Sequence, residues 1–408
     1  MRRPLYALVV LILISLALLL VFSSQFSNHE LSSGDNWPLY RHDASNTGSS
    51  SGPEPISSDL KLSYTLESDA TYSPNIPTVV DGRIYVSSND YKLYCIDGST
   101  GKEVWNFLTE FEKSYCPAVI DGKVYVGSGE FFRGSINEGC LYCLDASSGN
   151  QIWNYSTSDD LNSPVNFWEG KVYVVSRNGA IYCFEAQSGE KTWNFSMGTE
   201  GDCPAIADGY LYATNKEGEI FCLNATSGVN IWNITLGWSL SSPVALGGFI
   251  YLGSSDGNAY CLDASNGIKI WNYTTWYNSA GPAHGYEWGN TVSAPAVTND
   301  RVYVGSSDFD IFCLDATTGN KIWNFSTGGI ATHPPTVAGD SVFAGSYDGN
   351  LYCLNATSGL EIWRYPAGVF SPVSASGSVG SPVVSDGIVY VVGNGVLSAI
   401  GARVSSPN

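Results

Sequence analysis

Short apolar runs separated by tight turns recur along most of this chain. Within the segment from Pro243 to Tyr273, four such runs follow one another, at residues 244–246, 249–252, 259–262 and 268–273. Two-residue loops, Gly247-Gly248 and Asp256-Gly257, separate the first three runs, and loops of this composition favour tight hairpins with positive φ. The pattern predicts four short antiparallel strands, which we name A to D in chain order.

The unit of four strands occurs repeatedly, with a cysteine in strand C and a tryptophan ten residues later in strand D. The cysteines are Cys95, Cys143, Cys183, Cys222, Cys261, Cys313 and Cys353. The tryptophans are Trp105, Trp153, Trp193, Trp232, Trp271, Trp323 and Trp363. A repeat of about forty residues that is rich in strands indicates a propeller or a solenoid. Strict repetition indicates that the tryptophans pack in the core and do not form a cofactor site.

The A–B turn occurs once more than the tandem pair of strands C and D. After the last A–B turn, at Asp386, the chain reaches a strand C at residues 396–400 and has no strand D after it. Residues 60–64 align with strand D of the seventh unit, with Leu62 in the place of the tryptophan. We therefore expect an all-β fold, an eight-bladed β-propeller of four-stranded antiparallel blades over residues 60–401. The N-terminal strand would close the ring and leave no open sheet edge at the closure.

The two ends of the chain fall outside the repeats. Residues 1–23 contain an apolar run of 18 residues, Leu5 to Phe22, which is long for a signal peptide core and short for a spanning helix. An uncleaved signal anchor and a cleaved signal both fit, so we expect an exported chain at the cell surface, membrane-anchored through an N-terminal helix or secreted. Residues 24–59 are expected to form a tether and a lead-in along the propeller's flank, and residues 402–408 a tail.

The charge and the cysteines narrow the classes of partner and cofactor. The net charge is −19, and nucleic acid is excluded as an expected partner because phosphate backbones require Lys and Arg. A cysteine that recurs in strand C of each repeat is interpreted as a small buried apolar residue, not as half of a disulfide. Cys140 and Cys143 form a C-x-x-C, but their side chains should point to opposite faces of one strand.

Each repeat resembles the pyrroloquinoline-quinone-type β-propeller repeat, whose docking motif is A-x-D-x-x-T-G-x-x-x-W. The second repeat has this motif as Cys143-x-Asp145-x-x-Ser148-Gly149-x-x-x-Trp153. This family includes quinoprotein dehydrogenases and a bacterial outer-membrane assembly lipoprotein. The resemblance implies that the tryptophans pack between blades and that the acid anchors the C–D turn. Quinoprotein dehydrogenases also carry two adjacent cysteines over the quinone, and this chain has no such pair.

Other candidate chemistry is sparse. Asp256, Asp308, Asp310 and Asp348 lie in the B–C turns of three successive blades, where they would hold a calcium ion if they faced inward. Acidic turns of this kind are also common without a metal. No histidine pair has the spacing of metal ligands and no nucleophile motif is present. We therefore expect no catalytic residue and no cofactor, with calcium as the alternative.

Five N-x-S/T sequons begin directly after the repeat tryptophan on strand D, at Asn154, Asn194, Asn233, Asn272 and Asn324. Each asparagine should point away from the indole, to the outer rim of the propeller. Two further sequons, at Asn224 and Asn355, replace the acid of the C–D turn and should be less modified. The alternative is a repeat pattern that satisfies the acceptor rule by coincidence.

The long insertions lie on one face. In an antiparallel blade the A–B and C–D turns share one face and the B–C and D–A connections share the other. All long insertions belong to the second face, and their candidate binding residues are Phe131, Phe132, Arg133, Trp276, Tyr277, His284, Tyr286 and Trp288, with His333 on the next blade. Exposed aromatic rings supply contact area at a low entropy cost, unless they serve only to pack these loops onto the propeller.

From these observations we expect a non-enzymatic propeller that binds a protein or polysaccharide of the cell envelope through this face. Two alternatives stay open at this point. One is an oxidoreductase of the quinoprotein type, and the other is a purely structural component of a surface layer.

Overall fold

The structure is a computed structural model that describes residues 36–50, 52–55, 57–66, 76–88, 90–111, 113–129, 138–275, 291–368 and 379–401. All of them belong to one compact unit, Asp35–Asn408. The described residues form β-strands and turns without an α-helix. Nothing in this part of the chain is therefore a candidate for a membrane-spanning helix. The apolar run of residues 5–22 lies outside the described residues.

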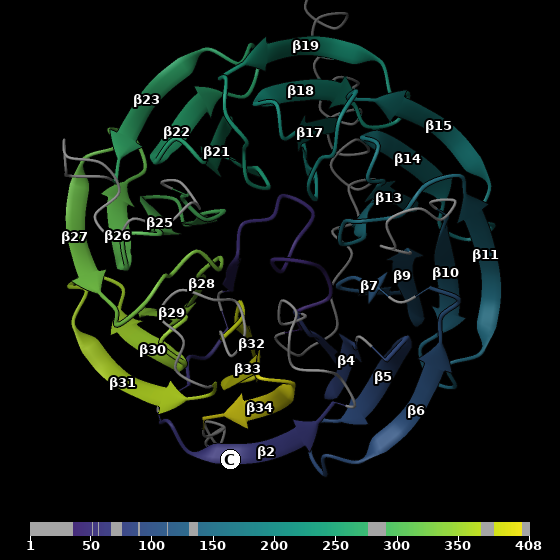
Figure 1. Ribbon diagram of the computed structural model, residues 1–408, viewed down its shortest axis with the longest axis horizontal. Coiled ribbons are helices and arrows are strands. Elements are labelled where there is room, and N and C mark those ends of the chain that lie inside the picture. The colour runs from purple at the N-terminus through teal and green to yellow at the C-terminus, as the bar shows by residue number, and fades with distance from the viewer. Residues whose placement is uncertain are drawn as a thin grey trace, which may run out of the picture. The chain divides into compact units, whose positions relative to one another are not determined.

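Eight sheets stand around one axis, which confirms the eight-bladed propeller (Figure 1). From strand A to strand D, the first blade contains β3 (Thr78–Val80), β4 (Arg83–Ser87), β5 (Lys92–Asp97) and β6 (Glu103–Leu108), and the second contains β8 (Ala118–Ile120), β9 (Lys123–Gly129), β10 (Gly139–Asp145) and β11 (Gln151–Thr157). The third blade contains β12 (Asn166–Trp168), β13 (Lys171–Val175), β14 (Ala180–Glu185) and β15 (Lys191–Ser196). The fourth contains β16 (Ala205–Ala207), β17 (Tyr210–Thr214), β18 (Glu219–Asn224) and β19 (Asn230–Thr235).

The other four blades follow the same order. The fifth blade contains β20 (Val244–Leu246), β21 (Phe249–Gly253), β22 (Asn258–Asp263) and β23 (Lys269–Thr274), and the sixth contains β24 (Ala296–Val297), β25 (Arg301–Gly305), β26 (Asp310–Asp315) and β27 (Lys321–Ser326). The seventh blade contains β28 (Thr336–Ala338), β29 (Ser341–Gly345), β30 (Asn350–Asn355) and β31 (Glu361–Pro366). The eighth contains β32 (Val383–Ser385), β33 (Ile388–Gly393), β34 (Val396–Ile400) and β2 (Leu60–Thr65). Two short strands join the edges of blades: β7 (Lys113–Ser114) pairs with β9, and β1 (Ser49–Ser50) pairs with β28.

Strand A of each blade lies nearest the axis and strand D forms the outer rim (Figure 1). The A–B hairpins have the expected turn geometry: Asp81 and Gly82 have φ of 51° and 71°, and the same pattern recurs at Asp121 and at Asp208. Positive φ at both turn residues matches the twist of the strands that the turn connects. The turn face, which carries the A–B and C–D turns, is therefore built from short, sharply defined connections.

Neighbouring blades are joined by the repeat tryptophan. Trp153 Nε1 of the second blade donates a hydrogen bond of 3.1 Å to the carbonyl oxygen of Ala186 in the third. Its ring covers Gly189, where a Cβ would lie 2.7 Å from the ring, so only glycine fits. Tyr125 donates its hydroxyl to the same carbonyl at 3.2 Å. The indole bond recurs in six pairs: Trp105–Ala146, Trp153–Ala186, Trp193–Ala225, Trp232–Ala264, Trp271–Ala316 and Trp323–Ala356.

The acid of the motif anchors the C–D turn, as the resemblance implied. Asp145 Oδ1 accepts hydrogen bonds from the backbone amides and hydroxyls of Ser147 and Ser148, at 2.6 to 3.1 Å. These donors stabilise the carboxylate, and the hydroxyl of Ser147 contributes most to lowering the pKa of Asp145 to about 2. The turn therefore holds the glycine that receives the indole of the preceding blade.

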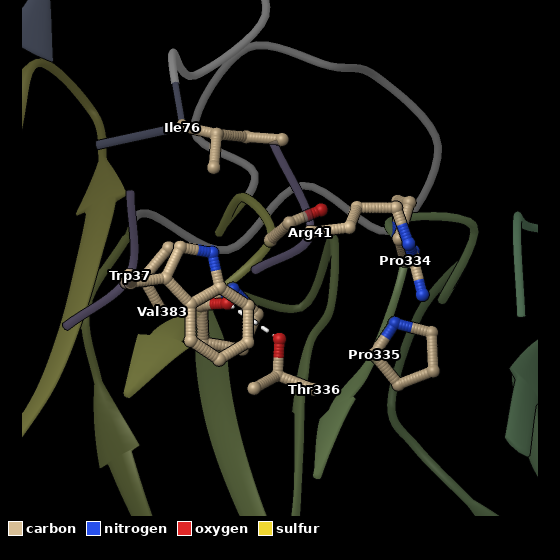
Figure 2. A pocket seen from close by; sticks show the side chains of 9 residues that line it. Trp37, Arg41, Ile76, Pro334, Pro335, Thr336 and Val383 are labelled. Atoms are coloured by element: carbon tan, nitrogen blue, oxygen red, sulfur yellow. Dashed lines mark hydrogen bonds between the residues drawn. The ribbon is translucent and has the colours of Figure 1, made fainter. Parts of the chain in front are cut away.

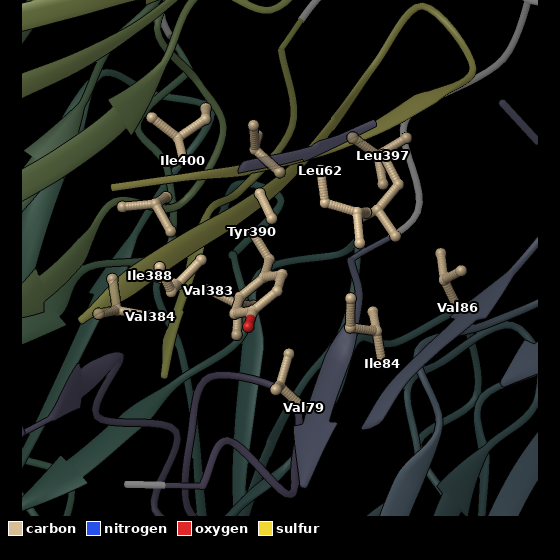
Figure 3. Close-up of a cluster of buried hydrophobic side chains, with 14 of the residues drawn as sticks. Leu62, Val79, Ile84, Val86, Val383, Val384, Ile388, Tyr390, Leu397 and Ile400 are labelled. Atoms are coloured by element: carbon tan, nitrogen blue, oxygen red, sulfur yellow. The ribbon is translucent and has the colours of Figure 1, made fainter. Parts of the chain in front are cut away.

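The N-terminal strand closes the ring, which confirms the expected pairing. β2 pairs antiparallel with β34, and Leu62 lies opposite Ala399. Figure 3 shows Leu62 and Leu397 above Tyr390 and Ile84, where the first and eighth blades meet. The closing strand thus contributes to the hydrophobic core and is more than a cover for an open edge.

The ten cysteines are all buried and unpaired thiols. Cys140 packs in the cluster between the first and second blades, whereas Cys143 packs in the cluster between the second and third. Their side chains therefore point to opposite faces of β10, as alternation along a strand requires. The interpretation of the repeat cysteines as small apolar core residues is confirmed.

Candidate functional site

Residues 36–50, which we call the axial segment, run through the centre of the ring (Figure 1). The segment enters beside the turn face, where the Asp81 amide donates to Asn36 Oδ1 at 2.9 Å. It leaves along the seventh blade, where β1 pairs in parallel with β28. The expectation of a lead-in along the propeller's flank is therefore wrong for these residues.

The axial segment lies there because the inner strands need hydrogen-bond partners. Each strand A pairs with strand B on one side only, so the second residue of strand A turns its N–H to the axis. Carbonyl oxygens of the axial segment accept six of these N–H groups, at 2.6 to 3.0 Å, from Val79, Val119, Ile206, Ala245, Val297 and Val337. In the third blade the Asn166 side chain replaces the backbone and donates to Ala44 O at 2.9 Å.

Two buried polar side chains fix the fold of the axial segment. Arg41 is 4% exposed, and its guanidinium donates to the backbone carbonyls of Asn46, Ala294 and Pro295. Burial lowers the pKa of Arg41. Asn46 is fully buried and its Nδ2 donates to the carbonyls of Cys203, Pro204 and Pro243, at 3.0 to 3.4 Å. Both residues have positive φ, 57° and 59°, a conformation that costs energy for a residue with a side chain.

One small cavity lies beside the axial segment. Figure 2 shows Trp37, Arg41 and Thr336 around a cavity of about 10 Å³, where Thr336 Oγ1 donates to Pro382 O at 2.6 Å. A cavity of this size holds about one water molecule. Binding sites for small molecules and cofactors have volumes of roughly 300 Å³ or more. This cavity is therefore too small for such a ligand.

The opposite face carries the B–C and D–A connections, and we call it the loop face. Of the nine candidate binding residues expected there, Phe131, Phe132, Arg133, Trp276, Tyr277, His284, Tyr286 and Trp288 lie outside the described residues. His333 is described, and its ring centroid lies 5.4 Å from that of Tyr347. Its buried Nε2 meets no hydrogen-bond partner among the described residues. Burial lowers the pKa of His333 to about 4, so this imidazole is neutral at physiological pH.

Two aromatic residues on the loop face were not expected. Tyr91 and Phe309 occupy B–C turns with φ of 70° and 72°. The equivalent positions in four other blades are glycines with φ of 81° to 86°: Gly179, Gly218, Gly257 and Gly349. A bulky residue in this conformation is an outlier that costs roughly 1–3 kcal/mol. The signal is present in the sequence, because Asp-Gly of the fifth and seventh blades becomes Asp90-Tyr91 and Asp308-Phe309.

The side chain of Tyr91 is 39% exposed, and Trp238, in a D–A connection of the same face, is 60% exposed. The backbone of the strained positions keeps its usual role: the carbonyls of Tyr91 and Phe309 accept hydrogen bonds of 2.7 Å from Thr109 and Thr327. Glycine in these turns would make the same bonds without strain. The rings themselves are therefore the feature that distinguishes these two turns.

Three of the aspartates considered for calcium accept hydrogen bonds from side chains of their own blades. Asp256 accepts a hydrogen bond of 2.5 Å from the Tyr260 hydroxyl, and Asp348 one of 2.5 Å from Tyr352. Asp310 accepts one of 2.5 Å from Ser326 on the outer strand. In the described part of the chain, no three His, Cys, Asp or Glu side chains are grouped as metal ligands.

The five sequon asparagines on strand D, Asn154, Asn194, Asn233, Asn272 and Asn324, are all exposed at the outer rim. The other two sequons are different. Asn224 and Asn355 are only partly exposed, and each Oδ1 accepts hydrogen bonds from the C–D turn, where an acid stands in most blades. The five asparagines of strand D are therefore more exposed than Asn224 and Asn355.

Solved structures of low sequence identity have the same fold. BamB from Moraxella catarrhalis is 18% identical, with 86% of this chain and 99% of that chain covered and a TM-score of 0.65. A quinohemoprotein alcohol dehydrogenase from Comamonas testosteroni is 17% identical, with 94% and 82% covered and a TM-score of 0.70. The computationally designed Ika8 protein is 12% identical, with 84% and 99% covered and a TM-score of 0.68. At such identities these likenesses show the fold alone.

No curated protein sequence matches the chain. A family model described as outer membrane protein assembly factor BamB matches residues 61–130, 112–201, 177–328 and 307–404. These overlapping matches cover every blade and most of the chain. The protein therefore belongs to the family of the outer membrane protein assembly factor BamB.

Proposed function

We propose that this protein is an exported, non-enzymatic propeller that binds a partner protein of the cell envelope through its loop face. The observation that carries the proposal is the pair of strained aromatic residues, Tyr91 and Phe309. Each occupies a turn in which glycine would avoid the strain, so the aromatic residue lowers the stability of the fold. Strained residues of this kind cluster at functional sites, which favours a role in recognition for this face. Aromatic rings are also enriched where proteins bind one another.

Two further observations support the proposal. In the sequence, the long insertions with their aromatic residues fall between strands B and C or between strands D and A, which are the connections expected on this face. The axial segment crosses the channel and forms hydrogen bonds with the inner strands, which disfavours a cofactor held on the axis. The family's description as an assembly factor is compatible with a protein partner.

The test places a photo-crosslinking amino acid at Tyr91, at Phe309 or at Tyr210 of the full chain in its own cells. Tyr210 begins β17 beside the turn face and is 40% exposed, which matches the 39% of Tyr91. We expect Tyr91 and Phe309 to crosslink to the same protein and Tyr210 not to do so. Crosslinks to polysaccharide alone, or equal labelling from all three positions, would contradict a protein partner on the loop face.

A second variant separates recognition from packing. Tyr91→Gly removes the ring and relieves the strained φ, so partner capture should fall while the free energy of unfolding stays equal or rises by about 1 kcal/mol. Tyr210→Ala is the matched control and should leave capture unchanged. A large loss of stability in Tyr91→Gly would show that the ring packs the turn.

The two alternatives give distinct results. A quinoprotein-type oxidoreductase would bind a quinone stoichiometrically and reduce a dye with an alcohol substrate, which absorbance titration of the purified protein detects. A structural surface-layer component would give crosslinks between copies of this chain. Either result would replace the proposal of a separate partner protein.

A further inference from the structure

The outer rim of the propeller is a set of exposed sheet edges. Strand D of each blade pairs with strand C on its inner side only. Its outer side presents unpaired N–H and C=O groups, which are a template for pairing with another chain. In seven blades a β-bulge interrupts the start of strand D, directly before the repeat tryptophan. The regular part of the edge therefore begins at the tryptophan and includes the next residues.

A belt of exposed apolar side chains adds to the tendency of these edges to pair with another chain. The residue before the repeat tryptophan is aliphatic in six blades and remains 43 to 52% exposed: Val104, Ile152, Ile231, Ile270, Ile322 and Ile362. Exposed edges that carry aliphatic side chains are predicted aggregation sites. The rim therefore needs a cover, and the described residues of the belt lie at the molecular surface without one.

The sequon asparagines occupy the centre of the regular edge. Asn154 lies two residues after Ile152 and two before Ser156, and Asn154 and Ser156 are both exposed on one side of β11. Two residues along a strand span about 7 Å, which is within reach of the first sugars of a glycan. The same arrangement recurs on β19, β23 and β27, and β15 has the exposed sequon with Thr192 in the place of the aliphatic residue.

We propose that Asn154, Asn194, Asn233, Asn272 and Asn324 carry N-linked glycans that cover the aliphatic belt and block pairing of the outer strands. This proposal rests on the export proposed above, because the glycan donor acts on exported chains. The donor is an oligosaccharide linked to a lipid phosphate. A bond forms between asparagine Nδ2 and the anomeric carbon, the bond from that carbon to the phosphate oxygen breaks, and the lipid phosphate leaves with the electron pair while the amide releases one proton.

Two of the three blades without a sequon on strand D carry other residues that protect an edge. β31 has Arg364 in the place of the asparagine and Pro366 two residues later, and both discourage pairing. β2 has Lys61, which is exposed on the same rim. Charge or proline therefore stands on two of the three outer strands that lack a sequon. This division of roles follows if the sequons protect edges.

β6 of the first blade supplies an internal control. Asn106 follows Trp105 and is exposed like its counterparts, but Leu108 stands where the others have Ser or Thr, and Leu108 is 65% exposed. Asn106 should therefore be unmodified for lack of the acceptor sequence alone. Asn224 and Asn355 supply the opposite control, because they have the sequon but their side chains bind the C–D turn.

The experiment maps glycopeptides by mass spectrometry on the full protein purified from its own cells. We expect a glycan mass on the five outer asparagines and none on Asn106. Ser156→Ala should remove the glycan from Asn154 only, because the asparagine itself is kept. Leu108→Thr should add a glycan at Asn106, because the change completes a sequon on an edge that is already exposed.

A second measurement tests the purpose of the cover. The variant with all five outer asparagines changed to glutamine should self-associate at concentrations where the native protein is monomeric in size-exclusion chromatography. Bare outer asparagines in protein found outside the cell overturn the glycan proposal and leave the proposed function standing. Bare asparagines in protein retained inside the cell overturn both. Glycans confined to Asn224 and Asn355, or no gain in Leu108→Thr, also overturn the role of the exposed edge.

Discussion

Leu62 lies against Gly101 at the junction that closes the ring, where a Cβ on the glycine would be 2.9 Å from Leu62 Cδ1. At six other junctions the corresponding glycine is covered by a tryptophan ring. Leu62 therefore takes the place of the indole at this junction. Its strand, β2, comes before the other seven blades in the sequence but completes the eighth. A large apolar side chain therefore covers the glycine at this junction too, although the two strands come from opposite ends of the propeller sequence.

The first prediction concerns this closing contact. Leu62→Ala should lower the free energy of unfolding by about 2–5 kcal/mol, because it removes a buried side chain and leaves a cavity between the first and eighth blades. Chemical denaturation followed by tryptophan fluorescence measures the change. Lys61→Ala, at the exposed neighbouring position, is the control and should have little effect. Equal effects of the two changes would mean that the buried Leu62 side chain does not stabilise the closing junction.

The second prediction compares two tryptophans. Trp153 Nε1 donates to Ala186 O, whereas Trp363 Nε1 is buried and finds no acceptor among the described residues. Trp153→Phe loses a hydrogen bond and leaves a buried carbonyl with one donor fewer, so it should cost about 1 kcal/mol more than Trp363→Phe. Thermal unfolding of the two variants side by side measures the difference. A greater loss in Trp363→Phe would mean that an acceptor exists in the intact protein.

The third prediction concerns the axial segment. Asn46→Gly retains a residue that tolerates φ of 59° but removes the amide that donates to three carbonyls. Unsatisfied buried carbonyls should lower the free energy of unfolding by about 1–3 kcal/mol. Ser49→Gly, in the same segment, is the control for the loss of a side chain. Denaturation curves that superimpose for Asn46→Gly and the parent would show that the amide is dispensable.

The fourth prediction concerns the buried thiols and pH. Burial raises the pKa of Cys95 and Cys143 from 9.0 to about 11. Because the folded pKa lies above the unfolded value, their contribution to stability is complete below pH 9 and decreases as the pH rises towards 11. The denaturation midpoint should therefore fall across this window, and Cys143→Ala should make the fall shallower. Ellman's reagent should label no thiol in the native protein at pH 8 and all ten after denaturation.

Much of the fold could be predicted from the sequence because the residues that form the contacts between blades recur in every repeat. The tryptophan, the glycine and the acid or asparagine of each unit return at fixed spacing, and each has one structural role. The missing strand D could be located because the alternation around Leu62 matches the other outer strands. Even the seventh junction is consistent: Phe343 stands where six other blades have a tyrosine that donates to the next blade's carbonyl.

The axial segment could not be located in the same way. Its position depends on carbonyl oxygens that any sequence would offer, and its partners are strands of only two or three residues. No periodicity of hydrophobic residues marks it, and its determinants, Arg41 and Asn46, appear as ordinary loop residues. The strained turns at Tyr91 and Phe309 could have been found by aligning the B–C turns, because only those two have an aromatic residue at a glycine position.

The path of the axial segment has a consequence for the order of events during synthesis. Residues 36–66 are made before the blades that they join, yet their partners include Val337 in the seventh blade and Ala399 in the eighth. At about 5–20 residues per second, more than 300 further residues take roughly 15–60 s to appear. During that time the axial segment lacks its partners in the later blades, and the first blade has no closing neighbour. A chaperone, or the translocation of the chain in an unfolded state, would bridge this interval, so completion of the ring is an event that follows translation.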